Sequence, residues 1–101
     1  MKPNLFLKDE YLKILIAIFD KHISNCHVFA YGSRVKGDSH SGSDLDLAII
    51  GKEEKIPLSL IREELRESNI PFYVEIFDFY KLPESFQSEI NTCKIEIYPQ
   101  Q

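Results

Sequence analysis

The stretch that decides the fold is YGSRVKGDSHSGSDLDLAII, residues 31–50. It holds three of the four glycines of a 101-residue chain, and its apolar end begins with Asp44-Leu45-Asp46. The apolar run is typical of a β-strand, and in a strand the side chains of residues 44 and 46 point to the same face. The sequence therefore predicts two neighbouring carboxylates at the start of a strand, directly after a loop rich in glycine and serine.

Two like charges on one face of a strand cost free energy. Their Cα atoms would lie about 6.6 Å apart at the usual rise of a strand. At an effective dielectric constant of about 20, the two charges repel each other by roughly 2.5 kcal/mol. A divalent cation between them would reverse the sign of this interaction, and carboxylate oxygens suit magnesium or manganese. The plainer alternative is that both aspartates lie in water at the strand end.

The loop before the two aspartates carries groups that suit a phosphate. Gly32-Ser33 follows a β-prone segment, and a glycine there lets the backbone N–H groups approach a ligand closely. Ser33 adds a hydroxyl, while Arg34 and Lys36 add positive charge. Each residue also has a plainer interpretation: Gly32 as a turn residue, Ser33 as a helix N-cap, and the two cations as solvated surface.

The segments around this stretch indicate a mixed sheet with helices packed on it. The expected helices cover residues 8–23, 58–68 and 84–90, and the expected strands cover residues 27–31, 45–50, 72–79 and 94–98. The first two strands are joined by a short loop and should be antiparallel, whereas those around the second helix can pair in parallel. The third strand is mostly apolar, so we expect it to be covered on both faces. The fold class is thus α/β (α+β), a mixed sheet of three to four strands in a single domain over residues 1–101.

Composition narrows the class of protein. The chain is 44% hydrophobic and 28% charged, with a net charge of −4, which suits a folded domain and argues against direct DNA binding. The longest apolar run, residues 14–19, is too short to span a membrane, and the N-terminus lacks the layout of a signal peptide. Cys26 and Cys93 have no metal-ligand spacing, so we expect free thiols in a reducing compartment. These features favour a cytoplasmic protein with no membrane contact.

The residues of the opening stretch also resemble a known family signature. Gly32-Ser33-Arg34, Gly37 and Ser43-Asp44-Leu45-Asp46-Leu47 look like the signature of the minimal nucleotidyltransferases, in the DNA polymerase β superfamily. The resemblance extends to the leading helix and the third strand, so it covers nearly the whole chain. It implies a nucleoside triphosphate such as ATP, two Mg²⁺ ions (with Mn²⁺ possible in their place) and transfer of a nucleoside monophosphate to an acceptor hydroxyl.

The resemblance assigns roles position by position. The positions implied for the nucleotide are Gly32, Ser33, Arg34 and Ser43, and those implied for catalysis and metal binding are Asp44, Asp46 and Glu75. Members usually carry aspartate as the third acid, so Glu75 departs from the pattern by one methylene. Asp78 ranks second for this role, because strand parity places it on the opposite face from Glu75. Its plainer interpretation is a cap at the strand end.

The resemblance also implies a partner. Many members are encoded beside a HEPN-domain protein, and in several such pairs the transferase is an antitoxin that adenylylates a tyrosine of a HEPN toxin. A chain of this size has little left to enclose a base or an acceptor, so we expect a second polypeptide to complete the site. The alternative is a non-catalytic antitoxin that neutralises its partner by contact. Transfer to a small molecule such as an aminoglycoside usually requires a large acceptor domain, which this chain lacks.

Two further sets of residues have open assignments at this point. Phe86, Ile90, Ile95 and Ile97 are apolar and available for docking a partner, although packing under the sheet is the plainer interpretation. Tyr31 is expected to pack against the first helix, with stacking on a nucleotide base as the alternative.

Overall fold

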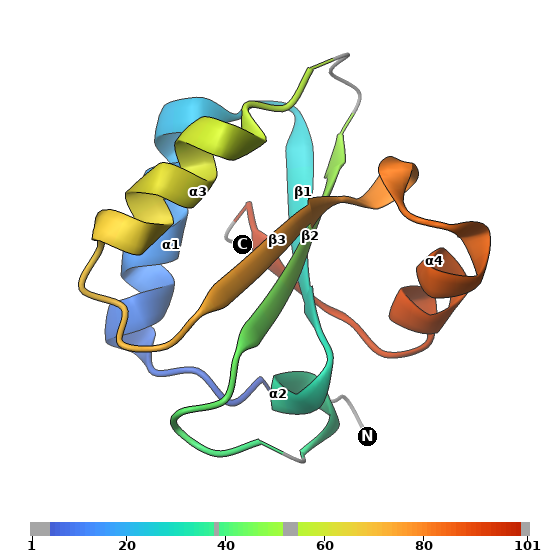
Figure 1. The fold of residues 1–101 in the computed structure, drawn as a ribbon, viewed down its shortest axis with the longest axis horizontal. Coiled ribbons are helices and arrows are strands. Elements are labelled where there is room, and N and C mark those ends of the chain that lie inside the picture. The colour runs from blue at the N-terminus through green and yellow to red at the C-terminus, as the bar shows by residue number, and fades with distance from the viewer. Residues whose placement is uncertain (1–4, 38, 52–54, 100–101) are drawn as a thin grey trace.

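The computed structural model describes residues 5–37, 39–51 and 55–99, and it contains a four-stranded mixed sheet with the strand order β3-β2-β1-β4 (Figure 1). Its elements are α1 (Asp9–His22), β1 (Cys26–Tyr31), α2 (Ser33–Lys36), β2 (Leu45–Gly51), α3 (Leu58–Glu67), β3 (Val74–Asp78), the 3-10 helix η1 (Phe79–Lys81), α4 (Glu84–Thr92) and β4 (Ile95–Tyr98). Within these described ranges, no helix combines the length and the apolar character needed to cross a bilayer.

The strand pairing agrees with the prediction. β1 pairs antiparallel with β2, β2 pairs in parallel with β3 around α3, and β4 pairs antiparallel with β1. The short loop between β1 and β2 permits only a return in the opposite direction, whereas the longer connection through α3 lets the chain cross over. The sequence therefore predicted the mixed sheet correctly, including its fourth strand.

The main core lies between one face of the sheet and the helices α1 and α3, which lie side by side on that face (Figure 1). The apolar residues recur at helical spacing in both helices, so each turns one stripe toward the sheet. The fully or nearly fully buried residues of the two helices are Leu15, Ile18, Phe19, Ile61 and Leu65. The sheet contributes alternate residues, because side chains one position apart point to opposite faces.

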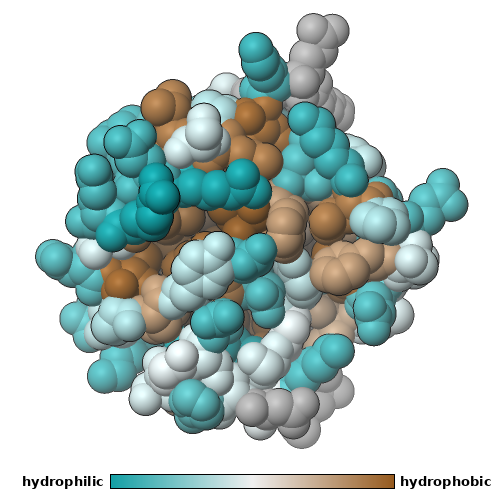
Figure 2. All heavy atoms as spheres, viewed as in Figure 1, coloured by the Kyte–Doolittle hydropathy of each residue, from teal (hydrophilic) through white to brown (hydrophobic). Residues whose placement is uncertain are grey.

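The opposite face of the sheet is only partly covered. A smaller cluster of Tyr31, Ala48, Phe79 and Ile90 lies there, under η1 and α4 (Figure 1). In the space-filling view, hydrophobic surface is visible in patches over this side of the molecule, bordered by hydrophilic side chains (Figure 2). The remainder of this face, toward the start of β2, is where the acidic residues lie.

Strand β3 corrects one expectation. It was expected to be covered on both faces, but it is an edge strand in which Val74 and Ile76 are buried while Glu75 and Phe77 are half-buried. The apolar appearance of the segment came partly from residues outside the strand, since Phe79 belongs to η1. The strand therefore has one covered face and one face open to a ligand.

Tyr31 corrects a second expectation. It packs in the smaller cluster, on the face opposite α1, with its ring centroid 6.0 Å from that of Phe86 in α4. Strand parity explains this, because residue 31 points away from the face to which Val28 and Ala30 contribute. The packing interpretation of the C-terminal apolar residues is confirmed for Ile90, which is buried, whereas Phe86 stays exposed.

Candidate active site

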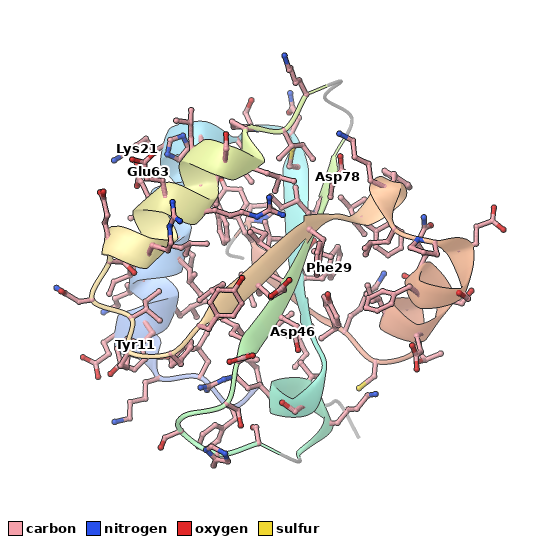
Figure 3. The ribbon with its side chains drawn as sticks, in the orientation of Figure 1. Tyr11, Lys21, Phe29, Asp46, Glu63 and Asp78 are labelled. Atoms are coloured by element: carbon pink, nitrogen blue, oxygen red, sulfur yellow. The ribbon has the colours of Figure 1, made fainter. Side chains whose placement is uncertain are left out.

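The three predicted acids lie at neighbouring positions on the open face of the sheet. Asp46 lies on β2 directly opposite Glu75 of β3, and on its other side it faces Tyr31 of β1. The Leu45 N–H donates to the Tyr73 carbonyl at 2.9 Å, which continues the β2–β3 pairing past the strand bounds to the level of Asp44. Figure 3 shows Asp46 near the start of β2, close to α2. The structure thus brings together acids that are 29 to 31 positions apart in the chain.

Burial and neighbouring charge act together on this group of acids. Burial raises the pKa of Asp46, and the charges of Asp44 and Glu75 raise it further. The pKa of Tyr31 is raised to about 12, first by burial and then by the charges of Asp46 and Glu75. Because these carboxylates repel each other, a cation placed among them would lower the free energy of the folded protein.

The glycine turn lies against this acidic group. Gly32 has a φ of +81°, which an L-residue rarely adopts, and a Cβ built on it would lie 2.4 Å from Asp46 Oδ2. A side chain at position 32 would therefore collide with the carboxylate. Gly32 is also the N-cap of α2, so Ser33 is the first residue of this short helix rather than its cap. The sequence did not predict α2, but it did predict that the turn and the acids belong to one site.

Arg34 has a different place from the one predicted. Its side chain is only 2% exposed, and its guanidinium donates to three carbonyl oxygens: Ser43 at 2.7 Å, Ser41 at 3.0 Å and Phe6 at 2.6 Å. Its Cζ lies 4.0 Å from the ring centroid of Phe72. This placement argues against both the expected phosphate contact and the solvated alternative. Arg34 instead anchors the loop that leads into Asp44, because its donors are occupied by backbone oxygens.

The loop before Asp44 is also organised by its own side chains. Ser43 Oγ accepts from the His40 N–H at 3.0 Å, and the Gly42 N–H donates to His40 Nδ1 at 3.1 Å. These contacts shape a turn immediately before the first acid. The Ser43 hydroxyl therefore has a structural contact here, and the nucleotide contact implied for it stays a prediction.

Tyr73 is a site residue that sequence reasoning missed. It lies two positions before Glu75 on the same face, and its side chain is 57% exposed. The pKa of Tyr73 is raised, mainly by its hydrogen bond to Glu75 and then by the charge of that carboxylate. It also lines a cavity of about 300 Å³ together with Arg62 and Arg66. The spacing of two residues from a predicted catalytic acid was the available signal.

Asp78 lies away from the site. It accepts a hydrogen bond from the Tyr80 N–H at 3.2 Å and is the N-cap of η1. Figure 3 places it at the opposite end of the strands from Asp46. The interpretation of Asp78 as a strand-end cap is confirmed.

The donor set fits a divalent metal in its chemistry. Asp44, Asp46 and Glu75 supply hard carboxylate oxygens on one face, and the charges of Asp44 and Glu75 add to the effect of burial in raising the pKa of Asp46. In residues 5–37, 39–51 and 55–99, however, no three His, Cys, Asp or Glu side chains are gathered tightly enough to count as a formed metal cluster. The acids therefore occupy neighbouring positions of the sheet, but their carboxylates do not converge on a common point where an ion could bind.

The fold and this site define a class: a nucleotidyltransferase domain, in which a mixed sheet presents acids beside a glycine–serine turn. The family model described as polymerase beta, nucleotidyltransferase matches residues 13–101. The chain therefore belongs to this nucleotidyltransferase family.

Similar proteins agree with this membership. A Haemophilus influenzae protein (strain Rd KW20) described as "Probable protein adenylyltransferase MntA" is 34% identical over 96 residues, covering 93% of this chain and 84% of the relative. A crystal structure of a toxin–antitoxin with AMP-PNP has a TM-score of 0.72 at 16% identity, covering 89% of this chain and 74% of that one. A crystal structure of the toxin–antitoxin MntA–HepT has a TM-score of 0.68 at 12% identity, covering 93% and 74%. The two structures show that the fold is shared.

Proposed function

We propose that this chain is an adenylyltransferase that moves AMP from ATP to a hydroxyl group, with a tyrosine of a HEPN-domain toxin as the acceptor, and that it thereby acts as an antitoxin. The observation that carries the proposal is the pairing of Asp46 with Glu75 on one open face, with Asp46 beside the Gly32 turn. Asp44, two positions before Asp46, is expected on the same face. The relative described as a protein adenylyltransferase supports the choice of AMP and of a protein acceptor.

The roles of the residues follow from their places. The backbone at Gly32 and the Ser33 hydroxyl bind the β- and γ-phosphates, because the turn brings them beside the acids. Asp44 and Asp46 would hold two Mg²⁺ or Mn²⁺ ions, with Glu75 sharing one of them. When bound, such ions neutralise phosphate charge and favour ionisation of the acceptor hydroxyl. Glu75 borders the open edge of the sheet, so it is placed to receive the proton of an incoming hydroxyl.

Arg34 contributes indirectly to the same site. It fixes the carbonyls of Ser41 and Ser43, so it limits the movement of Asp44, which follows directly. A carboxylate held in place before the nucleotide arrives needs less rearrangement for catalysis. Arg34 is thus a positioning residue in this proposal.

A partner is expected to complete the acceptor side. Strand β3 is at the sheet edge, and two exposed tyrosines flank it: Tyr73 directly before the strand and Tyr80 in η1 after it. Exposed aromatic side chains are common at protein–protein contacts. A toxin that docks over this edge would bring its tyrosine next to Glu75.

A second candidate function is neutralisation of the toxin by contact alone. Glu75 stands where aspartate is usual, and the acids of the described residues do not form a closed metal cluster. Complex formation without transfer would follow if the site is too loose for catalysis.

Incubation of the chain and its HEPN partner with MgCl₂ and ATP labelled at the α-phosphate separates these two functions. The proposal predicts label on the partner, and it predicts loss of the label with Asp44→Asn. Asp78→Asn is the matched control, since it removes an acid from the same sheet but from the opposite end. A stable complex that never becomes labelled would favour neutralisation by contact.

A further inference from the structure

Tyr73 combines exposure with a position inside the acidic site. Its carbonyl accepts from the Leu45 N–H at 2.9 Å, so the β2–β3 pairing holds the residue beside Asp44. Its side chain points to the same face as that of Glu75, because the two residues are two positions apart in an extended segment. Its ring is 57% exposed, so it is not needed to fill a core.

The Tyr73 phenol has Glu75 as its neighbour. The two residues are two positions apart in an extended segment, so both side chains stand on the acidic face. In agreement with this placement, Glu75 raises the pKa of the phenol and the charge of Arg62 lowers it. The proposed function assigns to Glu75 the acceptance of a proton from an incoming hydroxyl. The Tyr73 side chain therefore stands on the same face as the carboxylate to which the proposed function assigns this proton.

We propose that Tyr73 is a modification site, an acceptor for adenylyl transfer by the chain's own active site. This inference rests on the proposed function. The Tyr73 Oη forms a bond to the α-phosphorus of ATP, and the bond from that phosphorus to the oxygen bridging to the β-phosphate breaks. Pyrophosphate leaves, and the phenolic proton passes by way of the Glu75 carboxylate to solvent. No oxidant or further reactant is needed.

The cavity beside Tyr73 can hold the product. It has a volume of about 300 Å³, and its lining combines Arg62 and Arg66 with apolar side chains, including Leu65 and Phe72. Arginine pairs well with a phosphate, and apolar walls suit a nucleobase. An adenylyl group on Tyr73 would thus find a positively charged and partly apolar groove next to it, although the chain as a whole carries a net charge of −4.

The other tyrosines do not share these features. Tyr31 faces the acids but is only 8% exposed, and Tyr11 and Tyr98 pack with the main core near α1. Tyr80 is 64% exposed, but it follows Asp78 at the far end of β3. Tyr80 is therefore a matched control for Tyr73: an exposed tyrosine on the same edge, away from the acids.

The test uses the full chain with MgCl₂ and ATP labelled at the α-phosphate, with and without its HEPN partner. After protease digestion, mass spectrometry should locate an adenylyl group on the peptide that contains Tyr73. Tyr73→Phe should lose the self-label, while Tyr80→Phe should keep it. Because transfer is within one chain, dilution should leave the fraction labelled per unit time unchanged.

Several results would overturn the inference. An adenylyl group mapped to another residue, or a labelling rate that falls in proportion to dilution, would show that Tyr73 is not the internal acceptor. A chain that labels its partner and never itself would refute self-modification while leaving the proposed function intact. Absence of label on both proteins would refute the proposed function and this inference together. Mass spectrometry of the unsubstituted chain identifies the modified residue directly, so the test holds even if Tyr73→Phe also disturbs Glu75.

Discussion

Substitution of Gly32 by alanine should damage the site far more than it damages the fold. The added Cβ would lie 2.4 Å from Asp46 Oδ2, and ordinary contact begins at 3.4 Å, so the carboxylate has to move by about 1 Å. The carboxylate is the end of a short side chain, so it can rotate away without unfolding the strand. A misplacement on the order of 1 Å in a catalytic group can reduce the rate about a hundredfold.

Gly37→Ala is the matched control for this substitution. Gly37 also has a positive φ, of +88°, but a Cβ built there has no atom within 4 Å. Gly37→Ala carries the strain of an L-residue in the left-handed region, about 1–2 kcal/mol. Gly32 has a ψ of −154°, a conformation almost confined to glycine, so Gly32→Ala carries about 1–3 kcal/mol of strain. Only Gly32→Ala also displaces the Asp46 carboxylate.

Urea denaturation and transfer of α-labelled AMP measure the two effects separately. Gly37→Ala should lose about 1–2 kcal/mol in the free energy of unfolding, and Gly32→Ala about 1–3 kcal/mol. Gly32→Ala should in addition lose about a hundredfold in transfer rate, while Gly37→Ala should stay near the unsubstituted rate. Equal transfer rates in the two variants would refute the reasoning, because they would show that the contact between the turn and Asp46 does not matter for catalysis.

Three further predictions follow from the same structure. Arg34→Lys keeps the positive charge but loses the planar guanidinium that donates to several carbonyls at once. The free energy of unfolding, measured in urea, should therefore fall by about 2–4 kcal/mol. A loss under about 0.5 kcal/mol, the range of ordinary surface substitutions, would contradict the anchoring role. Asp46→Asn should abolish transfer, yet without metal at neutral pH it should raise the free energy of unfolding. The folded state raises the pKa of Asp46, so ionisation of this acid destabilises the fold. A variant less stable than the unsubstituted chain would contradict this sign. The pKa of Tyr31 is raised from 10 to about 12. The contribution of the protonated phenol to the free energy of unfolding is therefore intact below pH 10, and it is lost as the pH rises to about 12. Tyr31→Phe should weaken this alkaline loss in the pH dependence of unfolding. The remaining loss is due to Tyr98, whose pKa is also raised to about 12, and to Tyr73, whose pKa is raised as well. An unchanged curve would argue against the placement of Tyr31.

Local patterns were sufficient to predict much of the fold. The spacing of apolar residues located α1 and α3, and the lengths of the connections predicted which strands are parallel. Parity along a strand placed Asp44 and Asp46 on one face and separated Glu75 from Asp78. Each of these inferences depends only on residues close together in the sequence.

The errors concern contacts between distant segments. The sequence did not show that the Phe6 and Ser43 carbonyls accept hydrogen bonds from Arg34. The Arg34 side chain was therefore expected to contact a phosphate, although it is buried. It did not show that β4 joins the sheet beside β1, which leaves β3 at the edge with one face open. Tyr73 has Glu75 two positions away, but its place beside Asp44 comes from the β2–β3 pairing, which the sequence did not show.

The central claim is that the paired acids hold divalent ions against the triphosphate bound at the glycine turn. Calorimetry with the complex of the chain and its HEPN partner, titrated with a non-hydrolysable ATP analogue, tests this claim directly. The account predicts nucleotide binding that requires Mg²⁺ and that is lost with Asp44→Asn. Equal binding with and without Mg²⁺, or unchanged Mg²⁺-dependent binding by Asp44→Asn, would contradict it.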